Sequence, residues 1–333
     1  MPNWVGDLVM ATPILSELRR HFPDAEITAM CFERVAPLLE HDRDIDNLFT
    51  FSRPTIWMKR DQRRNLIATL RAREYDLALL LTNSFSSAFW FWVSRIPQRI
   101  GFRADRRSLL LTRSIDPPKE IETQHQVETN KSLLPLLGIA SSSSSPRLHL
   151  TPEERTLSRE RLTQLGIPPD APVIAINPGA AYGSAKCWLP ERFQEVTKAL
   201  LEDPRLCVLY FGDASQLSLV RQITAPFSSR VFSLAGSTTL RELTALISEV
   251  DLLLTNDSGP MHIAAALGTP LLSLFGSTSP IKTGPYGQPA LSVLQKKVAC
   301  APCYLRECPT DFRCMKRISA SEVHERLLSL LNK

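Results

Sequence analysis

The sequence predicts an α/β protein built from parallel sheets that are flanked by helices. Short apolar runs alternate with amphipathic stretches of helical length, which is the pattern of strands joined by crossover helices. Almost every apolar run in the second half ends at a glycine or a small polar residue that opens a helix. The chain has 333 residues, of which 44% are hydrophobic and 22% charged, so it is neither disordered nor fibrous and can form about two domains with sizeable cores.

Four apolar runs in the first half are predicted strands, at residues 26–31, 47–51, 76–82 and 99–102. Helices are expected between and after them, at residues 8–21, 34–40, 57–73, 85–94 and 124–137. The Gly6-Asp7 turn opens the first helix without a strand before it, so a first strand is expected to be missing. Five serines, Ser141–Ser145, cannot contribute to a core and mark the boundary between domains at 1–150 and 151–317.

The second half repeats the alternation more clearly, with strands expected at residues 173–177, 207–211, 231–234, 251–255 and 271–275. A helix at 319–331 closes the chain within a separate C-terminal element, residues 318–333. Ligands of open parallel sheets bind outside the carboxyl ends of the strands. Candidate functional residues are therefore expected in the turns that follow these runs.

Composition and charge narrow the possible classes of protein. The net charge of +5 is a mild excess that suits a phosphate-bearing ligand or an anionic membrane surface, and no basic run predicts a nucleic-acid partner. Seven cysteines in a chain of this length, with no secretory signal at the start, favour a reducing, cytoplasmic setting. The most apolar stretch, residues 77–93, is interrupted by polar residues, so we expect a strand and a helix there and no transmembrane segment.

The aromatic run Phe89-Trp90-Phe91-Trp92 lies within this stretch. Four consecutive residues cannot share one face of a helix, so we expect two or three of these rings to be buried. Contact of the rings with a membrane surface is the alternative.

The segment Thr255–His262 is the strongest candidate for a ligand site. It follows a buried strand and precedes a helix, so its turn presents helix N–H groups and the positive end of the helix dipole to an anion. Gly259 allows close approach to the backbone, and Asp257 and Ser258 can hold sugar hydroxyls or cap the helix. His262 can reach the same anion. The alternatives are an ordinary N-cap for Asp257 and a core histidine for His262.

The segment Asn177–Trp188 also follows a strand directly. Its small residues, Gly179 and Ala180 among them, leave room for a ligand, and Lys186 supplies a positive charge for a phosphate, unless it is a solvated surface lysine. The P-loop spacing is absent, and so is the Gly-x-Gly-x-x-Gly pattern of dinucleotide-dependent dehydrogenases. Two phosphate-friendly turns on neighbouring strand ends predict a diphosphate ligand.

Two further groups of residues allow two interpretations each. Asp7, at the start of the first helix, is either a general base whose anionic form the helix dipole stabilises or a simple helix cap. Four cysteines, Cys300, Cys303, Cys308 and Cys314, either hold zinc or an iron–sulfur cluster or are free thiols in a proline-rich loop. Cys300 and Cys303 form a Cys-x-x-Cys pair, but Cys308 and Cys314 do not form a second one, so we assign no metal site.

Taken in order, several motifs resemble those of the ADP-heptose:lipopolysaccharide heptosyltransferases of glycosyltransferase family 9, most of all the heptosyltransferase II type. The resemblance spans essentially the whole chain. It is carried by the runs 3–7, 178–180, 234–236 and 255–262, together with Lys186 and Trp188.

This resemblance implies a GT-B fold, with two Rossmann-like domains facing a cleft and the last helix packing back toward the N-terminal domain. It implies an inverting transfer of L-glycero-D-manno-heptose from ADP-heptose to a heptose of the lipopolysaccharide inner core, with no cofactor or metal required. The enzyme would be cytoplasmic and peripheral at the inner membrane. Alternatives are transfer to Kdo, as in the heptosyltransferase I type, or a nucleotide-binding protein with a structural thiolate metal site.

The resemblance also implies roles for individual residues. Asp7 would be the general base, and Lys186, Ser258, Gly259 and His262 would stabilise the departing diphosphate. The donor would also meet Gly179, Ala180, Gly236 and Asp257. The acceptor would meet Gly6, Asn83, Ser84, Arg60 and Arg63, although the arginines and Lys59 fit a solvated helix face equally well. Asp213 stands where related sequences often place a ribose-binding glutamate, so the ribose contact is left unassigned.

Overall fold

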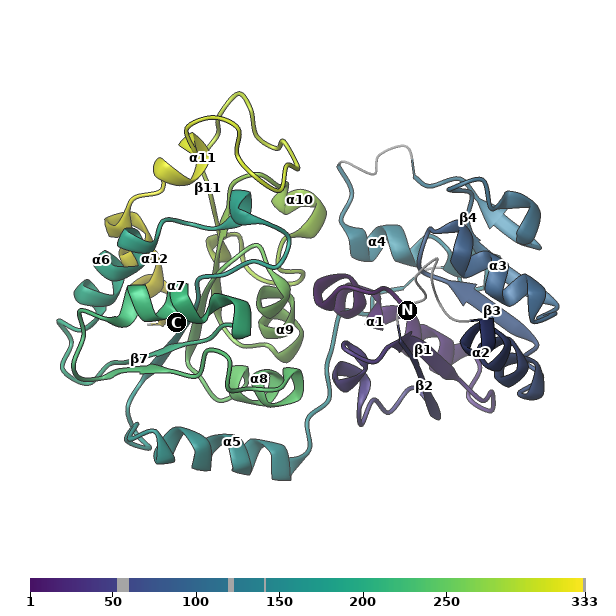
Figure 1. The fold of residues 1–333 in the computed structure, drawn as a ribbon, viewed down its shortest axis with the longest axis horizontal. Coiled ribbons are helices and arrows are strands. Elements are labelled where there is room, and N and C mark those ends of the chain that lie inside the picture. The colour runs from purple at the N-terminus through teal and green to yellow at the C-terminus, as the bar shows by residue number, and fades with distance from the viewer. Residues whose placement is uncertain (53–59, 119–122, 141, 332–333) are drawn as a thin grey trace. The chain divides into compact units, whose positions relative to one another are not determined.

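The computed structural model describes residues 1–52, 60–118, 123–140 and 142–331 (Figure 1). The chain divides into two compact units, Met1–Ser145 and Pro146–Lys333, so the division falls at the end of the serine run. Every strand pairing in the described residues is parallel. The predicted α/β class with parallel sheets is therefore confirmed.

The strands of the N-terminal unit form two separate sheets among the described residues. One sheet pairs β1 (Thr28–Phe32) with β2 (Asn47–Phe51), and the other has the order β3 (Leu77–Leu80), β4 (Gln98–Phe102), β5 (Arg113–Ile115). The helices are α1 (Val5–His21), α2 (Arg60–Ala72), α3 (Phe85–Val93) and α4 (Gln126–Lys131), with 3-10 turns η1 (Ala36–Leu39), η2 (Ser108–Leu110) and η3 (Leu134–Leu137). That a first strand is missing before Gly6-Asp7 stays a prediction.

Helix α1 begins at Val5, three residues earlier than expected, so Asp7 lies inside its first turn. Pro13 lies within the helix and has no N–H to donate to the carbonyl of Val9. The hydroxyl of Thr12 donates to that carbonyl instead, at 2.8 Å. This replacement bond lets the apolar residues of α1 continue through the unit's core.

The serine run is more than a spacer. Ser142 and Ser144 donate hydrogen bonds of 2.7 and 2.5 Å to Oε1 of Glu17, a fully buried carboxylate on α1. Arg20 donates to the same carboxylate at 2.9 Å. The start of the linker is therefore bound to the N-terminal unit through one acidic side chain.

The C-terminal unit has a single six-stranded sheet in the order β11-β10-β9-β6-β7-β8. Its strands are β6 (Val173–Asn177), β7 (Cys207–Tyr210), β8 (Val231–Ser233), β9 (Leu252–Asn256), β10 (Leu271–Phe275) and β11 (Val293–Gln295). The first strand, β6, is central and pairs with both β7 and β9, in the register Asn177 with Thr255. The direction of winding reverses between β6 and β9, and such a switch point is where open α/β sheets bind ligands.

The helices of this unit are α5 (Pro152–Gln164), α6 (Pro190–Leu200), α7 (Leu217–Thr224), α8 (Leu240–Ile247), α9 (Gly259–Leu267), α10 (Pro280–Thr283), α11 (Arg313–Lys316) and α12 (Ala320–Leu331). Short 3-10 turns are η4 (Ser184–Lys186), η5 (Ala214–Gln216) and η6 (Ala290–Ser292). No helix in the described ranges is both long and apolar enough to cross a membrane.

The last helix, α12, packs within the C-terminal unit, and its expected contact with the N-terminal domain stays a prediction. Val323, Leu327 and Leu330, on one face of α12, are buried in the core of the C-terminal unit. The helix lies beside α6 and against β9 and β10 (Figure 1). Its apolar face recurs at helical spacing and completes one side of the six-stranded sheet.

Candidate functional site

Two asparagines link the loops that follow β6 and β9. The amide of Asn177 donates to the carbonyl of Gly179 at 3.0 Å and to the hydroxyl of Ser258 at 3.3 Å. The amide of Asn256 donates to the carbonyl of Pro178 at 2.7 Å, and its oxygen accepts from the N–H of Trp188 at 3.1 Å. The two turns singled out in the sequence are therefore one structure. The functional interpretation missed both asparagines, although each is a polar residue that closes an apolar strand.

Lys186 and Asp257 form the charged centre of this structure. The Nζ atom of Lys186 lies 2.5 Å from Oδ2 of Asp257, and only 15% and 4% of the two side chains are exposed. The hydroxyl of Thr278, which the sequence did not single out, donates to the same oxygen at 2.6 Å. Asp257 thus binds a lysine and a threonine and is not the N-cap of α9. Lys186, likewise, is not a solvated surface lysine.

The N-terminus of α9 lies directly beside this pair. Ser258 is the N-cap residue, but its side chain makes no capping bond to the helix. Its hydroxyl instead lies 3.0 Å from that of Thr255. Gly259 and Pro260 follow as half-buried residues. The first-turn N–H groups that point out of a helix attract anions, and the helix dipole adds to that attraction.

The small residues along the carboxyl edge let other parts of the unit approach the backbone closely, so the room expected for a ligand at Gly179 is occupied by the side chain of Gln216. A side chain at Gly179 would meet the amide of Gln216 at 2.1 to 2.3 Å. Gly236 has a φ of 70°, a left-handed conformation that favours glycine, and its N–H donates to the carbonyl of Gly212 at 2.8 Å. Ala180 is half-buried and His262 is buried. Asp213 accepts hydrogen bonds from both the N–H and the hydroxyl of Ser215 and caps η5.

A second loop supports the one that carries Lys186. The hydroxyl of Tyr182 donates to the carbonyl of Tyr304 at 2.7 Å, and the N–H of Ala185 donates to the carbonyl of Arg306 at 2.9 Å. The Lys186 ammonium and the Arg306 guanidinium lie 4.9 and 5.4 Å from the centre of the Tyr182 ring. These contacts fix the loop around Lys186 against the cysteine-containing loop, residues 300–314.

The cysteines of that loop are free thiols, of which Cys314 is buried and Cys300 exposed. Among the residues that the structure describes, no three His, Cys, Asp or Glu side chains converge in a way that could hold a metal ion. The loop contacts the Lys186 loop and also Ser277, whose carbonyl accepts from the N–H groups of Cys303 and Tyr304 at 3.0 and 2.7 Å. Cys314 belongs to the core of the C-terminal unit.

Candidate residues of the N-terminal unit lie on three of its helices. Gly6 and Asp7 are half-buried in the first turn of α1. Ser84 is the N-cap of α3 and accepts from the N–H of Ser87. Arg63 is exposed on α2. Arg60 begins that helix, and its side chain lies outside the described structure, as does Lys59.

Arg107 is a structural residue that the sequence did not indicate. It is fully buried and donates to the carbonyls of Phe102, at 3.0 Å, and Thr82. It also donates to Asn83 Oδ1 and Ser87 Oγ, both at 3.2 Å. Burial lowers the pKa of Arg107 to about 10, which leaves it charged at neutral pH. Asn83 is thus held in place from within the unit.

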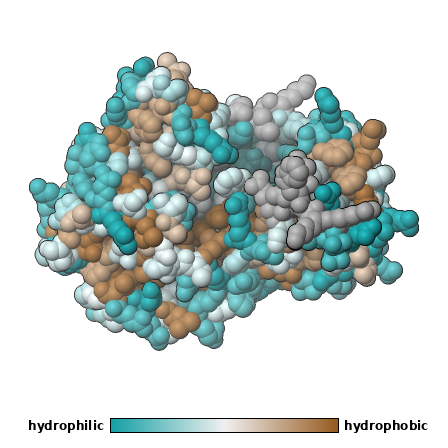
Figure 2. All heavy atoms as spheres, in the orientation of Figure 1, coloured by the Kyte–Doolittle hydropathy of each residue, from teal (hydrophilic) through white to brown (hydrophobic). Residues whose placement is uncertain are grey.

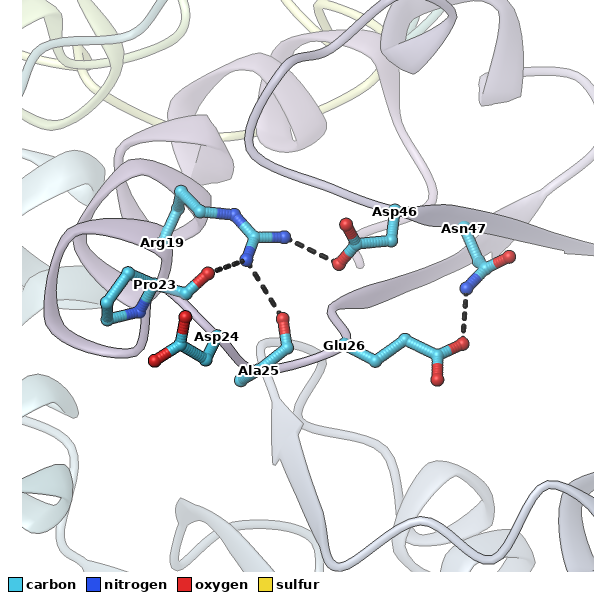
Figure 3. A pocket seen from close by; sticks show the side chains of 7 residues that line it. All are labelled: Arg19, Pro23, Asp24, Ala25, Glu26, Asp46 and Asn47. Atoms are coloured by element: carbon cyan, nitrogen blue, oxygen red, sulfur yellow. Dashed lines mark hydrogen bonds and ion pairs between the residues drawn. The ribbon is translucent and has the colours of Figure 1, made fainter.

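A surface hollow in the N-terminal unit lies away from these residues, at the amino ends of β1 and β2 (Figure 3). Its polar groups bind one another: Arg19 lies 2.5 Å from Asp46 and donates to the carbonyls of Pro23 and Ala25. A backbone hydrogen bond from Ile27, and the Arg19 contact, lower the pKa of Asp46. The hollow is a network of satisfied groups that ties α1 to the strands.

Comparison with known proteins gives matches over most of the chain. The model of glycosyltransferase family 9 (heptosyltransferase) matches residues 63–312. Lipopolysaccharide heptosyltransferase 2 of Escherichia coli (strain K12) is 31% identical over 301 residues, which are 87% of this chain and 85% of that protein. Lipopolysaccharide heptosyltransferase 3 of the same strain is 31% identical over 288 residues, 84% of this chain and 82% of that protein.

Solved structures also match this chain over nearly its whole length. The structure of E. coli ADP-heptose lps heptosyltransferase II is 28% identical, with a TM-score of 0.83 over 99% of this chain and 97% of that one. A glycosyl transferase family 9 structure from Veillonella parvula, 22% identical, has a TM-score of 0.85 over 100% and 95% of the two chains and shows the same fold. The GT-B fold implied by the resemblance is confirmed.

Proposed function

Because the chain belongs to glycosyltransferase family 9 (heptosyltransferase), we propose that it transfers L-glycero-D-manno-heptose from ADP-heptose to a heptose of the lipopolysaccharide inner core. The observation that carries the proposal is the position of the buried Lys186–Asp257 pair beside the N-terminus of α9, at the switch point of the sheet. A positive charge and a helix N-terminus at one strand edge suit a diphosphate.

In the donor site, the diphosphate of ADP-heptose meets the first-turn N–H groups of α9 at Ser258-Gly259 and the ammonium of Lys186. Both stabilise the negative charge that grows on ADP as it departs. The ion pair with Asp257 holds Lys186 in place, and a hydrogen bond from Thr278 holds Asp257 in place. The narrow backbone edge at Gly179, Ala180 and Gly236 receives the rest of the donor, and His262 lies one turn into α9.

In the N-terminal unit, Asp7 acts as the general base. Its position in the first turn of α1 favours the carboxylate form. A hydroxyl oxygen of the acceptor attacks the anomeric carbon of the donor heptose and its proton passes to Asp7. The bond from that carbon to the β-phosphate oxygen breaks, and its electron pair leaves with ADP. A single displacement of this kind inverts the anomeric centre, and Gly6, Asn83, Ser84, Arg60 and Arg63 are the proposed acceptor contacts.

Mixing the full chain with ADP-heptose and a heptosylated inner-core acceptor, and measuring the release of ADP, tests the activity. Release with this acceptor but not with one that ends in Kdo supports heptosyltransferase II-type transfer. Release with the Kdo acceptor alone would assign the heptosyltransferase I type instead. If the protein binds ADP but releases none with either acceptor, the result would favour a nucleotide-binding protein without transferase activity. Among the described residues, no group of cysteines converges as a thiolate metal site would require.

We further propose that the protein works in the cytoplasm, at the face of the inner membrane, because the proposed acceptor is a lipid-linked saccharide. The net charge of +5 fits an anionic lipid surface.

A further inference from the structure

Helix α3 is an apolar helix that the fold covers only in part. All nine of its residues are described, and only Ala88 among them is buried. The expected burial of two or three rings in the run Phe89–Trp92 is only partial: three of the rings are half-buried, Phe91 among them packs against a core cluster, and Trp92 is 48% exposed. A helix this rich in aromatic residues normally packs into a core, so its exposure needs a partner.

Three rings form a row along α3, with Phe85 and Trp92 exposed and Phe89 half-buried between them. Phe85, Phe89 and Trp92 are spaced four and three residues apart, so they share one face of α3. The rings of Phe85 and Phe89 stack with centres 6.1 Å apart, and those of Phe89 and Trp92 lie 6.0 Å apart. Leu109, 95% exposed, lies on η2, which packs against α3. We call these four residues the aromatic patch, and Figure 2 shows apolar surface over α3 at the right of the view.

The surroundings of the aromatic patch are basic. Residues 60–118 contain eleven arginines against five acidic residues, a net charge of +6, whereas the whole chain carries +5. Exposed Arg71 donates to the carbonyl of Val93 at 2.8 Å, at the end of α3, and exposed Arg95 and Arg106 follow α3 and precede η2. Asp105 is the acidic neighbour, and its carboxylate binds the N–H of Phe85.

We infer that the aromatic patch docks the protein on an anionic phospholipid bilayer. Aromatic rings with apolar bodies settle at the level of lipid headgroups, and arginines around them are attracted to anionic lipids. The same charge would repel a second copy of the chain, which disfavours self-association through the patch. The inference rests on the proposed function in one respect, because it gives a lipid-linked acceptor a surface on which the enzyme can meet it.

Flotation of the full chain with lipid vesicles tests this inference. Binding is expected to vesicles of phosphatidylglycerol with phosphatidylethanolamine, and not to phosphatidylcholine, and added salt should weaken it. A variant with Trp92→Ser and Leu109→Ser should bind the anionic vesicles at least about tenfold more weakly, because two apolar contacts with the interface are lost. The matched control is Phe22→Ser with Leu157→Ser, which removes one exposed aromatic and one exposed leucine side chain elsewhere.

Three results would overturn the inference: equal binding of the patch variant and wild type, equal binding to phosphatidylcholine, or a dilution-dependent dimer that the patch variant abolishes. Quenching of tryptophan fluorescence by brominated lipids should fall in Trp92→Phe, which keeps an aromatic ring.

Transfer to a lipid-free oligosaccharide acceptor separates the docking inference from the proposed function. If the patch variant transfers heptose to this acceptor but no longer binds vesicles, the proposed function and the docking inference are both supported. If the wild-type protein does not transfer heptose to it, the proposed function fails while the docking result is unaffected.

Discussion

The Lys186 ammonium lies 2.5 Å from the carboxylate of Asp257, which also accepts a hydrogen bond of 2.6 Å from Thr278. The lysine assigned to the departing diphosphate is thus held, before any donor binds, by an acidic residue at the start of the very turn that opens α9. This arrangement holds the Lys186 ammonium near the N-terminus of α9. Donor binding therefore does not have to order a flexible lysine side chain.

Replacing Lys186 with methionine is expected to weaken ADP binding by about 10- to 100-fold, because one charge-assisted contact with the diphosphate is lost. Titration calorimetry with ADP measures the affinity.

Asp257→Ala, in contrast, should lower the free energy of unfolding by about 3 kcal/mol, since it leaves a largely buried lysine unpaired. Thermal or urea unfolding of Lys186→Met with Asp257→Leu should show a smaller loss than the sum of the single changes. Unchanged ADP affinity in Lys186→Met would contradict its assignment.

Asp7→Asn is expected to reduce turnover by about 10²- to 10⁴-fold, because the side chain keeps its size but can no longer accept the proton of the acceptor hydroxyl. ADP affinity should stay at the wild-type value, since the proposed donor site lies on the other unit. ADP release under saturating substrates measures the first quantity and calorimetry the second. A variant that retained full turnover would remove Asp7 from the mechanism.

Gly183→Ala tests the support that the cysteine-containing loop gives to the Lys186 loop. A Cβ atom at this position would lie 2.3 Å from the carbonyl oxygen of Arg306, so the two loops must move apart. We expect weaker ADP binding and slower transfer in this variant. Gly287→Ala is the matched control, because a Cβ there meets no atom within 4 Å and only the strain of its φ of 76° is added, about 1 kcal/mol. Equal ADP affinity of the two variants would rule out a supporting role.

Arg107→Lys should destabilise the N-terminal unit by about 3 kcal/mol, because a single ammonium cannot serve the four acceptors that the guanidinium holds. Urea unfolding of the full chain measures this loss. ADP affinity is the internal control, since the C-terminal unit does not contain Arg107. Wild-type stability in the variant would show that water satisfies these acceptors.

Glu17 makes stability depend on pH. Burial alone would raise its pKa, but hydrogen bonds from Ser144 and Ser142, together with Arg20, outweigh this and lower it below the ordinary value of 4.5. A carboxylate with a lowered pKa stabilises the fold above its unfolded pKa, and that stability is lost as pH falls through the folded value. Glu17→Gln should therefore be less stable than wild type at pH 7, and the difference should shrink below pH 4.5.

Melting temperatures of wild type and Glu17→Gln across this pH range measure the effect of Glu17. Ser144→Ala provides a milder companion variant, because it removes one of the hydrogen bonds and keeps the charge. A stability difference that does not change with pH would mean that the pKa of Glu17 is the same in the folded and unfolded chain.

Local sequence patterns suffice to predict the parallel α/β class, the boundary at the serine run and the two turns that form the candidate donor site. These features depend on local patterns: strand-length apolar runs, a stretch that cannot form a core, and small polar residues where a strand ends and a helix begins. The expected start of the first helix lies within three residues of the observed start of α1 at Val5, because such boundaries depend on neighbouring residues.

Only the tertiary structure decided which side chains meet. Lys186 and Asp257 are 71 residues apart, and no spacing rule indicates that they pair; Arg107, similarly, became the centre of a buried network only once β3 and β4 lay side by side. The same holds for burial. Both α12 and α3 carry apolar residues in the sequence, yet one face of α12 lies in the core of the C-terminal unit whereas Phe85 and Trp92 of α3 stay exposed. Hydrophobicity predicts that a face needs cover, and the arrangement of the other elements determines whether the protein itself supplies it.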